Sequence, residues 1–562
     1  MNSASPWLPL LTVIVPLAGA LLLWLLPARA ARVLAGLALL VAAVAALAVA
    51  VGFFAQPTAA MRHVANWPWF PDWGIALRVG VDGLAAALLA LSGLIGVVAW
   101  ISSATITSRV RAYHSLLLLL MAGANGVFIT TDWVCFYICW EVMLIPMFLL
   151  IAAWGGEQRR YAATKFFLIT MAGSVLMLVV MLALYFRTPA AGLTVRVDPA
   201  VVAAQGIDGR LHGLRVDTVQ VPVSDHGETI LISTQQVTVP RSFDMLHHAL
   251  LWEHWTKVSL LGAPLAVMGF AFLFLAFAIK VPIVPLHTWL PHAHVQAPTA
   301  ISVILAGILL KLGVFGFLRI AWPIFPTVAM EWGWVLGVLA LVNILAGAWI
   351  ALMQRDLKRL VAYASVSHMG FCLLGVVAAT PLAITGSAVQ AVTHGLGSAM
   401  LFLLVGVIYD RVHHRRVDGF GGLATPMPRY AGLFLFAALA AAGLPGLAGF
   451  VGEVMTILGA VQSNAGTWAG HGADAFRWFG ILAAGSVILS AAYLLWAYQR
   501  MFTGPVSEEH RSLPDLTVRE WSALAPCAVL TLAIGVYPSL VTRVVGPGCE
   551  LLAAHLAWIS AR

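Results

Sequence analysis

Residues 271–320 read AFLFLAFAIKVPIVPLHTWLPHAHVQAPTAISVILAGILLKLGVFGFLRI, an apolar stretch that holds Lys280 beside two prolines and Lys311 one span later. A lone charge at the centre of a bilayer costs roughly 2.5 to 3.5 kcal/mol even on the cheapest scale. A proline in a membrane helix frees carbonyls that water or polar groups must satisfy. The stretch therefore predicts two membrane helices with buried ammonium groups, the first broken beside its lysine, and its default interpretation is a proton or ion path.

The rest of the chain has the same membrane character from end to end. Of 562 residues, 61% are hydrophobic and 10% are charged, and the mean hydropathy is +0.94. This composition excludes a soluble globular protein. We expect an all-α polytopic membrane protein with about fourteen transmembrane helices. Their apolar runs are centred near residues 16, 43, 91, 121, 143, 176, 272, 310, 344, 370, 397, 445, 488 and 532.

A second interrupted span, GLPGLAGFVGE at residues 443–453, lies five spans after the first. Paired discontinuous helices at matching positions indicate two repeated halves, each able to build half of a channel. The sequence thus predicts two discontinuous helices, with breaks near residues 282 and 446.

One large polar interval, residues 188–256, separates the apolar runs. Within it VDTVQVPV (216–223) and ETILISTQQVTVP (228–240) alternate in polarity or are rich in β-branched residues. The turn residues Ser224-Asp225-His226-Gly227 lie between these two runs. This pattern predicts a small β-hairpin-like insertion.

The distribution of Lys and Arg predicts the topology, because cytoplasmic loops retain positive charge. With the N-terminus on the outer side, most loops on the inner side are basic, and the 188–256 insertion lies on the outer face. Trp252 and Trp255, near its end, suit an anchor at the membrane interface. Residues 1–15 lack a basic n-region, so the first apolar run is expected to be a retained span. The net charge of +8 follows from topology and does not argue for nucleic-acid binding.

No motif for a metal or cofactor accompanies the apolar runs. The five cysteines show neither CxxC spacing nor a His/Cys cluster, and no glycine-rich nucleotide loop is found. His247, His248, Glu253 and His254 match no ligand spacing, and interfacial polar residues explain them more simply. We therefore expect no metal and no cofactor in this chain.

Glu141 lies mid-span in CFYICWEVMLIPMFLL (135–150), beside Trp140 and before Pro146. A carboxylate near the ammonium of Lys280 would form a pair whose protonation states respond to each other. The alternative is a permanent salt bridge that joins two spans, and the functional interpretation is favoured over it.

The remaining ionisable residues extend this pair across the bilayer. Lys311 is one span beyond Lys280, His368 and His394 titrate near neutral pH, and Glu453 follows the second interruption. A lone buried histidine is as often a hydrogen-bonded core residue as a relay. The candidate proton path is a polar line parallel to the membrane plane, in the order Glu141, Lys280, Lys311, His368, His394, Glu453.

Several long motifs resemble the antiporter-like membrane subunits of respiratory complex I, in the order of that family and over about residues 80–505. They are WEVMLIPMFLLIAAWGGEQRRYAATKFFLIT, KVPIVPLHTWLPHAHVQAPTAISVILAGILLK, DLKRLVAYASVSHMGF, HGLGSAMLFLLVGVIYDR and GLPGLAGFVGE.

The resemblance implies a proton-translocating subunit that is energised by electron transfer from NADH to quinone in partner subunits. It implies fourteen helices, two inverted five-helix repeats, and breaks in helices seven and twelve. Flavin and iron–sulfur clusters are then expected in the partners, and this chain would be a non-redox subunit of the enzyme complex. Other membrane-arm subunits, including neighbouring antiporter-like subunits, lipid and protons are the expected partners, in a bacterial inner membrane.

The resemblance also implies roles and boundaries. Glu141 and Lys280 match the family's essential pair, Lys311 its central lysine, His368 and His394 its connecting histidines, and Glu453 its terminal acidic residue facing the outer side. The expected divisions are helices one to three (1–112), the first repeat with its insertion (113–322), the second repeat (334–503), and an inner loop, last helix and tail (504–562).

Alternative functions stay open from the residues alone. The chain could be the large subunit of a multisubunit sodium/proton antiporter, a membrane subunit of a hydrogenase complex, or an enzyme with its own quinone site, although no cofactor motif supports the last. The 188–256 insertion is longer and more strand-like than the family's outer loop, and a structural role against an adjacent subunit is favoured over a ligand site. Lys280→Ala is expected to harm activity more than a change at Lys358, taken here as a surface lysine.

Overall fold

Apolar segments of this chain form helices because a backbone in hydrocarbon must satisfy its N–H and C=O groups within its own segment. The computed structural model describes residues 5–196, 214–225, 228–260, 262–464 and 474–560. Within them, twelve helical segments are long and apolar enough to cross a membrane. These segments are α1 (Trp7–Leu22) with η1 (Leu23–Leu25), α2 (Ala28–Ala55), α3 (Gly83–Ser102) with η3 (Ser103–Thr105), α4 (Val110–Ile129), α5 (Trp133–Val142) with α6 (Leu144–Trp154), α7 (Arg159–Arg187), the α13–α15 run (Thr299–Ile324), α17 (Gly333–Leu352), α18 (Leu357–Val377), α19 (Pro381–Val412), α23 (Ala475–Phe502) and α24 (Val518–Val536).

Two further segments are interrupted, as the prolines and glycines predict. The first consists of α11 (Leu265–Lys280), η4 (Leu286–Thr288) and α12 (Trp289–Gln296), and the second of α20 (Pro428–Ala441) and α21 (Ala448–Val461). The all-α membrane fold and the two discontinuous helices are confirmed. The exact count of fourteen helices and the inverted relation of the two halves stay predictions.

The span after the first break is helical but irregular. It comprises α13 (Thr299–Ile304), the π-helical turn η5 (Leu305–Leu309), α14 (Leu310–Gly316), a second π-helical turn η6 (Phe317–Ala321), and α15 (Trp322–Ile324). Wide turns of this kind are often found at functional sites. No sequence pattern marks these turns, because each involves one extra residue per turn and no proline or glycine cluster.

The α13–α15 run and α19 form the centre of the bundle, where an 18-residue stretch of each is fully buried. The outer helices α1, α2, α23 and α24 instead expose large apolar side chains such as Leu21, Val44, Ile488 and Val536. Contiguous apolar surface of this kind is what lipid or a neighbouring membrane subunit covers.

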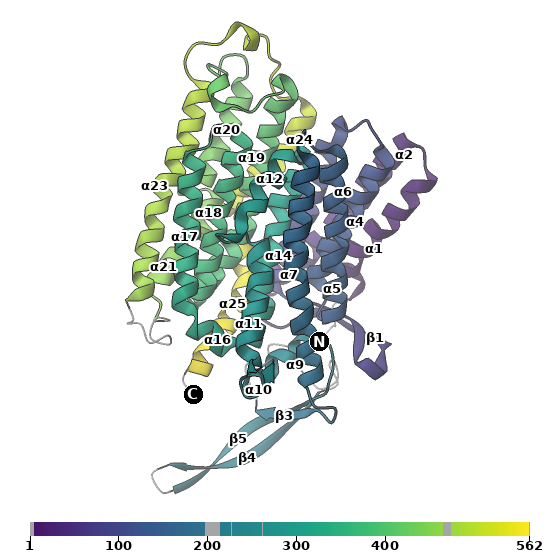
Figure 1. Cartoon of the computed structure of the whole chain (residues 1–562), viewed down its shortest axis with the longest axis vertical. Coiled ribbons are helices and arrows are strands. Elements are labelled where there is room, and N and C mark those ends of the chain that lie inside the picture. Colours follow the sequence, from purple (N-terminus) through teal and green to yellow (C-terminus); the bar gives the residue numbers. More distant parts are fainter. Residues whose placement is uncertain (1–4, 197–213, 226–227, 261, 465–473, 561–562) are drawn as a thin grey trace.

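Short strands and helices gather at one end of the bundle (Figure 1). β1 (Arg62–Phe70) pairs with β2 (Ile75–Val81), with η2 (Pro71–Trp73) between them, and β3 (Leu193–Arg196), β5 (Glu228–Val239) and β4 (Arg215–Asp225) form an antiparallel sheet in that spatial order. The predicted hairpin is confirmed, with Val216 opposite Val237 and Ser224 opposite Thr229. His226 and Gly227 of its predicted turn lie outside the described residues. The remaining elements at this end are α9 (Met245–Leu250), α10 (Trp252–Lys257), β6 (Ser259–Leu260), β7 (Ala263–Pro264) and α16 (Pro326–Glu331).

The C-terminal segment, expected as a tail, forms a helix, α25 (Ser539–Ser560). Its buried residues include Val541, Val545, Cys549, Ala553 and Leu556, which recur every three to four positions and so share one face. That face packs against α19, α3 and α2. At the end of the bundle opposite the hairpin, η7 (Val417–Gly419) lies in the loop between α19 and α20, and η8 (Glu508–His510) lies in the loop between α23 and α24.

Candidate functional site

Lys280 is the last residue of α11, and its side chain is 2% exposed. Its Nζ lies 5.1 Å from the ring centroid of Trp140 and 5.8 Å from that of Phe166. Two aromatic faces at this distance stabilise a cation by electrostatic attraction to the rings. The ammonium predicted from the sequence is therefore inside the bundle, between α5 and α7.

The break after Lys280 is held open by side chains that satisfy its backbone. Trp289 Nε1 donates to the carbonyl oxygen of Ile279 at 2.9 Å, and the Val284 N–H donates to Asn343 Oδ1 at 2.8 Å. Asn343 in turn donates to the carbonyl oxygen of Val366 at 2.8 Å. The break therefore has a defined conformation, which is fixed by these hydrogen bonds and which joins α11, α12, α17 and α18.

Glu141 lies on α5, beside the Trp140 ring that faces Lys280, and its residue is half-buried. Its charge and that of Lys280 are close enough to interact, but no ion pair within 4 Å joins them among the described residues. Oε1 is buried and has no hydrogen-bond partner in the described part of the chain. The structure brings the predicted pair into one region without direct contact.

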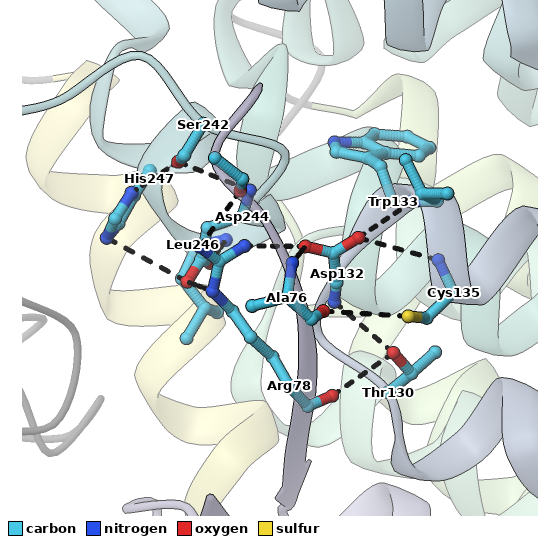
Figure 2. A network of polar contacts seen from close by, with 12 residues as sticks. Ala76, Arg78, Thr130, Asp132, Trp133, Cys135, Ser242, Asp244, Leu246 and His247 are labelled. Carbon is cyan, nitrogen blue, oxygen red and sulfur yellow. Dashed lines mark hydrogen bonds and ion pairs between the residues drawn. The ribbon is translucent and has the colours of Figure 1, made fainter. Parts of the chain in front are cut away.

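The helix that carries Glu141 is anchored at its N-terminus by a buried ionic network (Figure 2). Asp132 caps α5 by accepting from the Val134 and Cys135 N–H groups, and its Oδ2 lies 2.5 Å from Arg78 Nη1. Arg78 Nε also lies 3.4 Å from Asp244 Oδ2, and Asp244 caps α9 through the Leu246 N–H. Burial raises the pKa of Asp132 to about 6, although Arg78 lowers it.

This network joins three segments that are distant in the sequence: β2, the start of α5, and α9 after the outer insertion. A histidine next to it does not carry charge. Trp133 Nε1 donates to His248 Nδ1 at 3.0 Å, and burial lowers the pKa of His248 to about 3. The segment after the hairpin is therefore fixed to the helix of Glu141 by Arg78, by the Trp133–His248 hydrogen bond, and by backbone hydrogen bonds from Trp133 to Phe243 and from Met245 to Thr131.

Replacing Arg78 by alanine is expected to destabilise the hairpin end of the protein. Removing one partner of a buried ion pair typically costs about 3–5 kcal/mol, because the other charge is left without compensation. The measurement is thermal unfolding of the purified complex. Arg416→Ala is the matched control, since its pair with Asp418 is exposed and should contribute little. Equal stability of the two variants would contradict an anchoring role for Arg78.

Lys311 lies on α14 between the two π-helical turns and has no exposed surface. Its Nζ donates to the carbonyl oxygen of Ala306 in the first of these turns. It also lies 2.9 Å from His394 Nδ1 on α19. The widened turn thus presents a carbonyl to the ammonium, and the predicted link from central lysine to histidine is present as a contact.

The line continues from His394 through His368 to Glu453. The ring centroids of His394 and His368 are 5.5 Å apart, and His368 Nδ1 lies 2.9 Å from Glu453 Oε1. Gln390 Nε2 donates to the same carboxylate oxygen at 3.5 Å. A cavity of about 20 Å³ among these side chains is large enough for roughly one water molecule.

The second helix break positions Glu453 on the first turns of α21. Gly443 in that break has a φ of +78°, which favours glycine, and a Cβ there would lie 2.7 Å from Glu453 Oε2. The absence of a side chain at Gly443 leaves room for the carboxylate, which is 4% exposed. Lys280 and Lys311, by contrast, share no direct polar contact among the described residues.

The expectation that Lys358 is a surface lysine is wrong. It lies on the first turn of α18, is 5% exposed, and its Nζ donates to the carbonyl oxygen of Ala297 at 2.6 Å. The charged motif DLKR indicated a loop, but α18 begins at Leu357, and Lys358 lies in the first turn of a helix that is buried at nearly every position. Three of the five lysines of the chain are therefore buried.

His294 on α12 is the other residue that the sequence analysis missed. It has no exposed surface, and its ring stacks on Phe402 with centroids 4.2 Å apart. A histidine in a proline-rich stretch carries no distinguishing pattern, so its burial could not be read from the sequence.

Comparisons with known proteins agree with this architecture. A family model described as NADH:quinone oxidoreductase/Mrp antiporter, TM, matches residues 130–197 and 242–473. NADH-quinone oxidoreductase subunit M of Rhodobacter capsulatus is 39% identical over 497 residues, covering 88% of this chain and 84% of the relative.

Solved structures show the same fold. A chain of respiratory complex I from Thermus thermophilus with bound NADH matches with a TM-score of 0.75 and 29% identity, covering 98% of this chain and 99% of that one. A chain of the Mrp complex from Dietzia sp. shares the fold, with a TM-score of 0.74, 20% identity and 99% coverage of both chains. The resemblance seen in the motifs is confirmed, and the chain belongs to the NADH:quinone oxidoreductase/Mrp antiporter family of membrane subunits.

Proposed function

We propose that this chain moves protons across the membrane as a subunit of a complex I-type NADH:quinone oxidoreductase. The observation that carries the proposal is the chain of contacts Lys311–His394–His368–Glu453, buried at the centre of the bundle. Each member can bind and release a proton, and adjacent members are within hydrogen-bonding reach or one water apart. The relatives are named as subunits of NADH-quinone oxidoreductase and of respiratory complex I, and these names support NADH:quinone electron transfer as the reaction of the partner subunits.

The mechanism is electrostatic. A charge change arriving from a neighbouring subunit acts on Glu141, which is half-buried and has an unpartnered carboxylate oxygen among the described residues. The altered charge of Glu141 changes the proton affinity of Lys280, and protons move through Lys311 and the histidines toward Glu453. Moving one charge against 100 mV costs about 2.3 kcal/mol, which electron transfer in the partners supplies.

The chain itself contributes no electron carrier in this proposal. Among the described residues, no group of three or more His, Cys, Asp or Glu side chains is placed to hold a metal ion. Flavin and iron–sulfur clusters belong to partner subunits, and the oxidoreductase activity is a property of the assembled complex. The non-redox role of this subunit is to conduct protons.

The proposed setting is a bacterial inner membrane, with the hairpin end on the outer side. The basic loops after α3, α6, α17 and α19 lie at the end opposite the hairpin, as the positive-inside rule requires. The N-terminus then lies on the outer side. Glu453 is the last residue of the path, from which protons leave toward the outer side.

Glu141→Gln tests the function. The variant keeps the size of the side chain and removes its charge, so NADH-driven proton uptake and NADH:quinone electron transfer should both collapse in inverted native membrane vesicles. Assembly of the complex is checked in the same vesicles. Unchanged activities in an assembled complex would contradict the redox-coupled function and favour sodium/proton antiport, which is then measured as sodium-dependent transport without NADH.

A further inference from the structure

A cavity of about 320 Å³ lies at the end of the bundle opposite the hairpin. Polar and charged side chains line it, among them Lys358, Gln296, Asp410, Arg415 and Glu520. Asp410 is exposed, so the cavity reaches the surface. At about 30 Å³ for each water molecule, it has room for roughly ten. The cavity is therefore a hydrated recess on the side proposed to face the cytoplasm.

Lys358 forms part of the wall of this recess. An ammonium has three N–H donors, and among the described residues Lys358 Nζ has one acceptor, the Ala297 carbonyl oxygen at 2.6 Å. Water in the cavity supplies acceptors for the remaining N–H groups. A buried lysine with water on one side is a group that can take a proton from solvent and pass it inward.

His294 lies on α12, two residues before the Gln296 that lines the cavity. Both of its ring nitrogens are buried, and neither has a hydrogen-bond partner in the described part of the chain. Buried polar atoms in folded proteins almost always have partners, so two orphaned nitrogens on one ring indicate bound water. A neutral imidazole has one donor and one acceptor, and it can accept a proton on one nitrogen while it releases one from the other.

His294 lies near the contact that Lys358 makes with α12. Lys358 Nζ donates to the carbonyl oxygen of Ala297, which caps α12 three residues after His294. The ring stacks on Phe402 of α19, eight residues after His394, which contacts Lys311. His394 and Phe402 are thus about 12 Å apart along the axis of α19. The Lys311 side chain and one or two water molecules are long enough to connect the His294 ring, at Phe402, with His394.

We infer that Lys358 and His294 form a proton entry that leads from the hydrated cavity directly to Lys311, without passing through Lys280. A proton from cavity water binds Lys358 Nζ and passes through water to one nitrogen of His294. The opposite nitrogen releases its proton through water to Lys311, so no charge accumulates on the ring. The route rests on the proposed function for the steps beyond Lys311.

Lys358→Arg separates proton transfer from structure. Arginine keeps the positive charge and can donate to the Ala297 carbonyl, but it does not deprotonate at neutral pH. We expect proton uptake in inverted vesicles to fall by roughly tenfold or more in Lys358→Arg and in Lys358→Met, since acid–base groups contribute about 10²–10⁴-fold. A purely structural lysine would instead be rescued by arginine and not by methionine. Lys257→Arg, at an exposed position, is the control and should pump like the wild type.

His294→Phe tests the second step in the same assay. Phenylalanine preserves the stacking on Phe402 and removes both nitrogens, so proton uptake should fall as in Lys358→Arg. Wild-type pumping in both variants, with Glu141→Gln inactive, would overturn the entry route and leave the proposed function intact. Normal pumping in all three would contradict the proposed function itself.

Access to the cavity is tested independently of pumping. A Lys358→Cys variant should react with a membrane-impermeant thiol reagent in inverted vesicles and not in right-side-out vesicles. This result requires only an assembled complex, which is checked by native electrophoresis. Failure of an assembled Lys358→Cys complex to react from either side would overturn the entry route.

Discussion

Lys280→Ala is expected to abolish proton uptake and coupled electron transfer, with a loss of roughly 100-fold or more. The ammonium lies beside the Trp140 and Phe166 rings at the helix break. Among the described residues, Lys280 is the cation that contacts these two rings. Its removal also leaves the partly buried Glu141 without the positive charge that acts on it. The measurement is NADH-driven proton uptake and electron transfer in inverted vesicles.

Lys280→Arg is expected to be nearly as inactive as Lys280→Ala, because a guanidinium keeps its proton at physiological pH. Lys257→Ala is the appropriate surface control, since Lys358 is itself buried. Retention of more than half of the wild-type proton uptake by an assembled Lys280→Ala complex would exclude Lys280 from the coupling of electron transfer to proton movement.

Lys311→Met is expected to stop proton uptake while the protein stays folded. Lys311 has no exposed surface, and its Nζ provides the contact between the first half of the bundle and the histidines of the second. Methionine has a similar volume and carries no charge, and replacing a buried charge by an apolar side chain is often neutral or stabilising. Thermal stability should therefore be unchanged or higher, while proton uptake falls by roughly 100-fold or more.

This opposite response of stability and activity distinguishes a conducting group from a structural one. Both quantities are measured on the same preparation, by thermal unfolding of the purified complex and by proton uptake in vesicles. A large drop in stability with partial activity would indicate that Lys311 holds the helices together, and pumping at the wild-type rate would remove it from the path.

The breaks and the buried lysines could be predicted because their causes are local. Proline removes a backbone hydrogen bond wherever it lies, so Pro282 and Pro285 indicate the end of α11 directly. A lysine in the middle of an apolar run has no route to water, so the burial of Lys280 and Lys311 follows from the sequence. The hairpin was predictable for the same reason, from β-branched runs around a turn.

The contacts of the site could not be predicted, because they depend on how distant helices pack. His368 and Glu453 are 85 residues apart, and neither sequence neighbourhood indicates the other. Whether Glu141 and Lys280 come into direct contact likewise depends on how α5 and α11 pack. Lys358 was misjudged because a charged motif at a helix start resembles a loop, although the same motif opens a helix whose inner face is buried.

The burial of three of the five lysines has a practical consequence for mapping the neighbours of this chain. Reagents that couple amines reach its exposed Lys257 and its half-buried Lys165, and reach Lys358 only through the cavity, but do not reach Lys280 or Lys311. A nearly empty amine cross-link map would thus reflect where the nitrogen atoms lie rather than isolation of the subunit. Carboxylate-directed chemistry is the better choice, because Asp72 is exposed at the hairpin end and Glu508 and Glu509 at the opposite end.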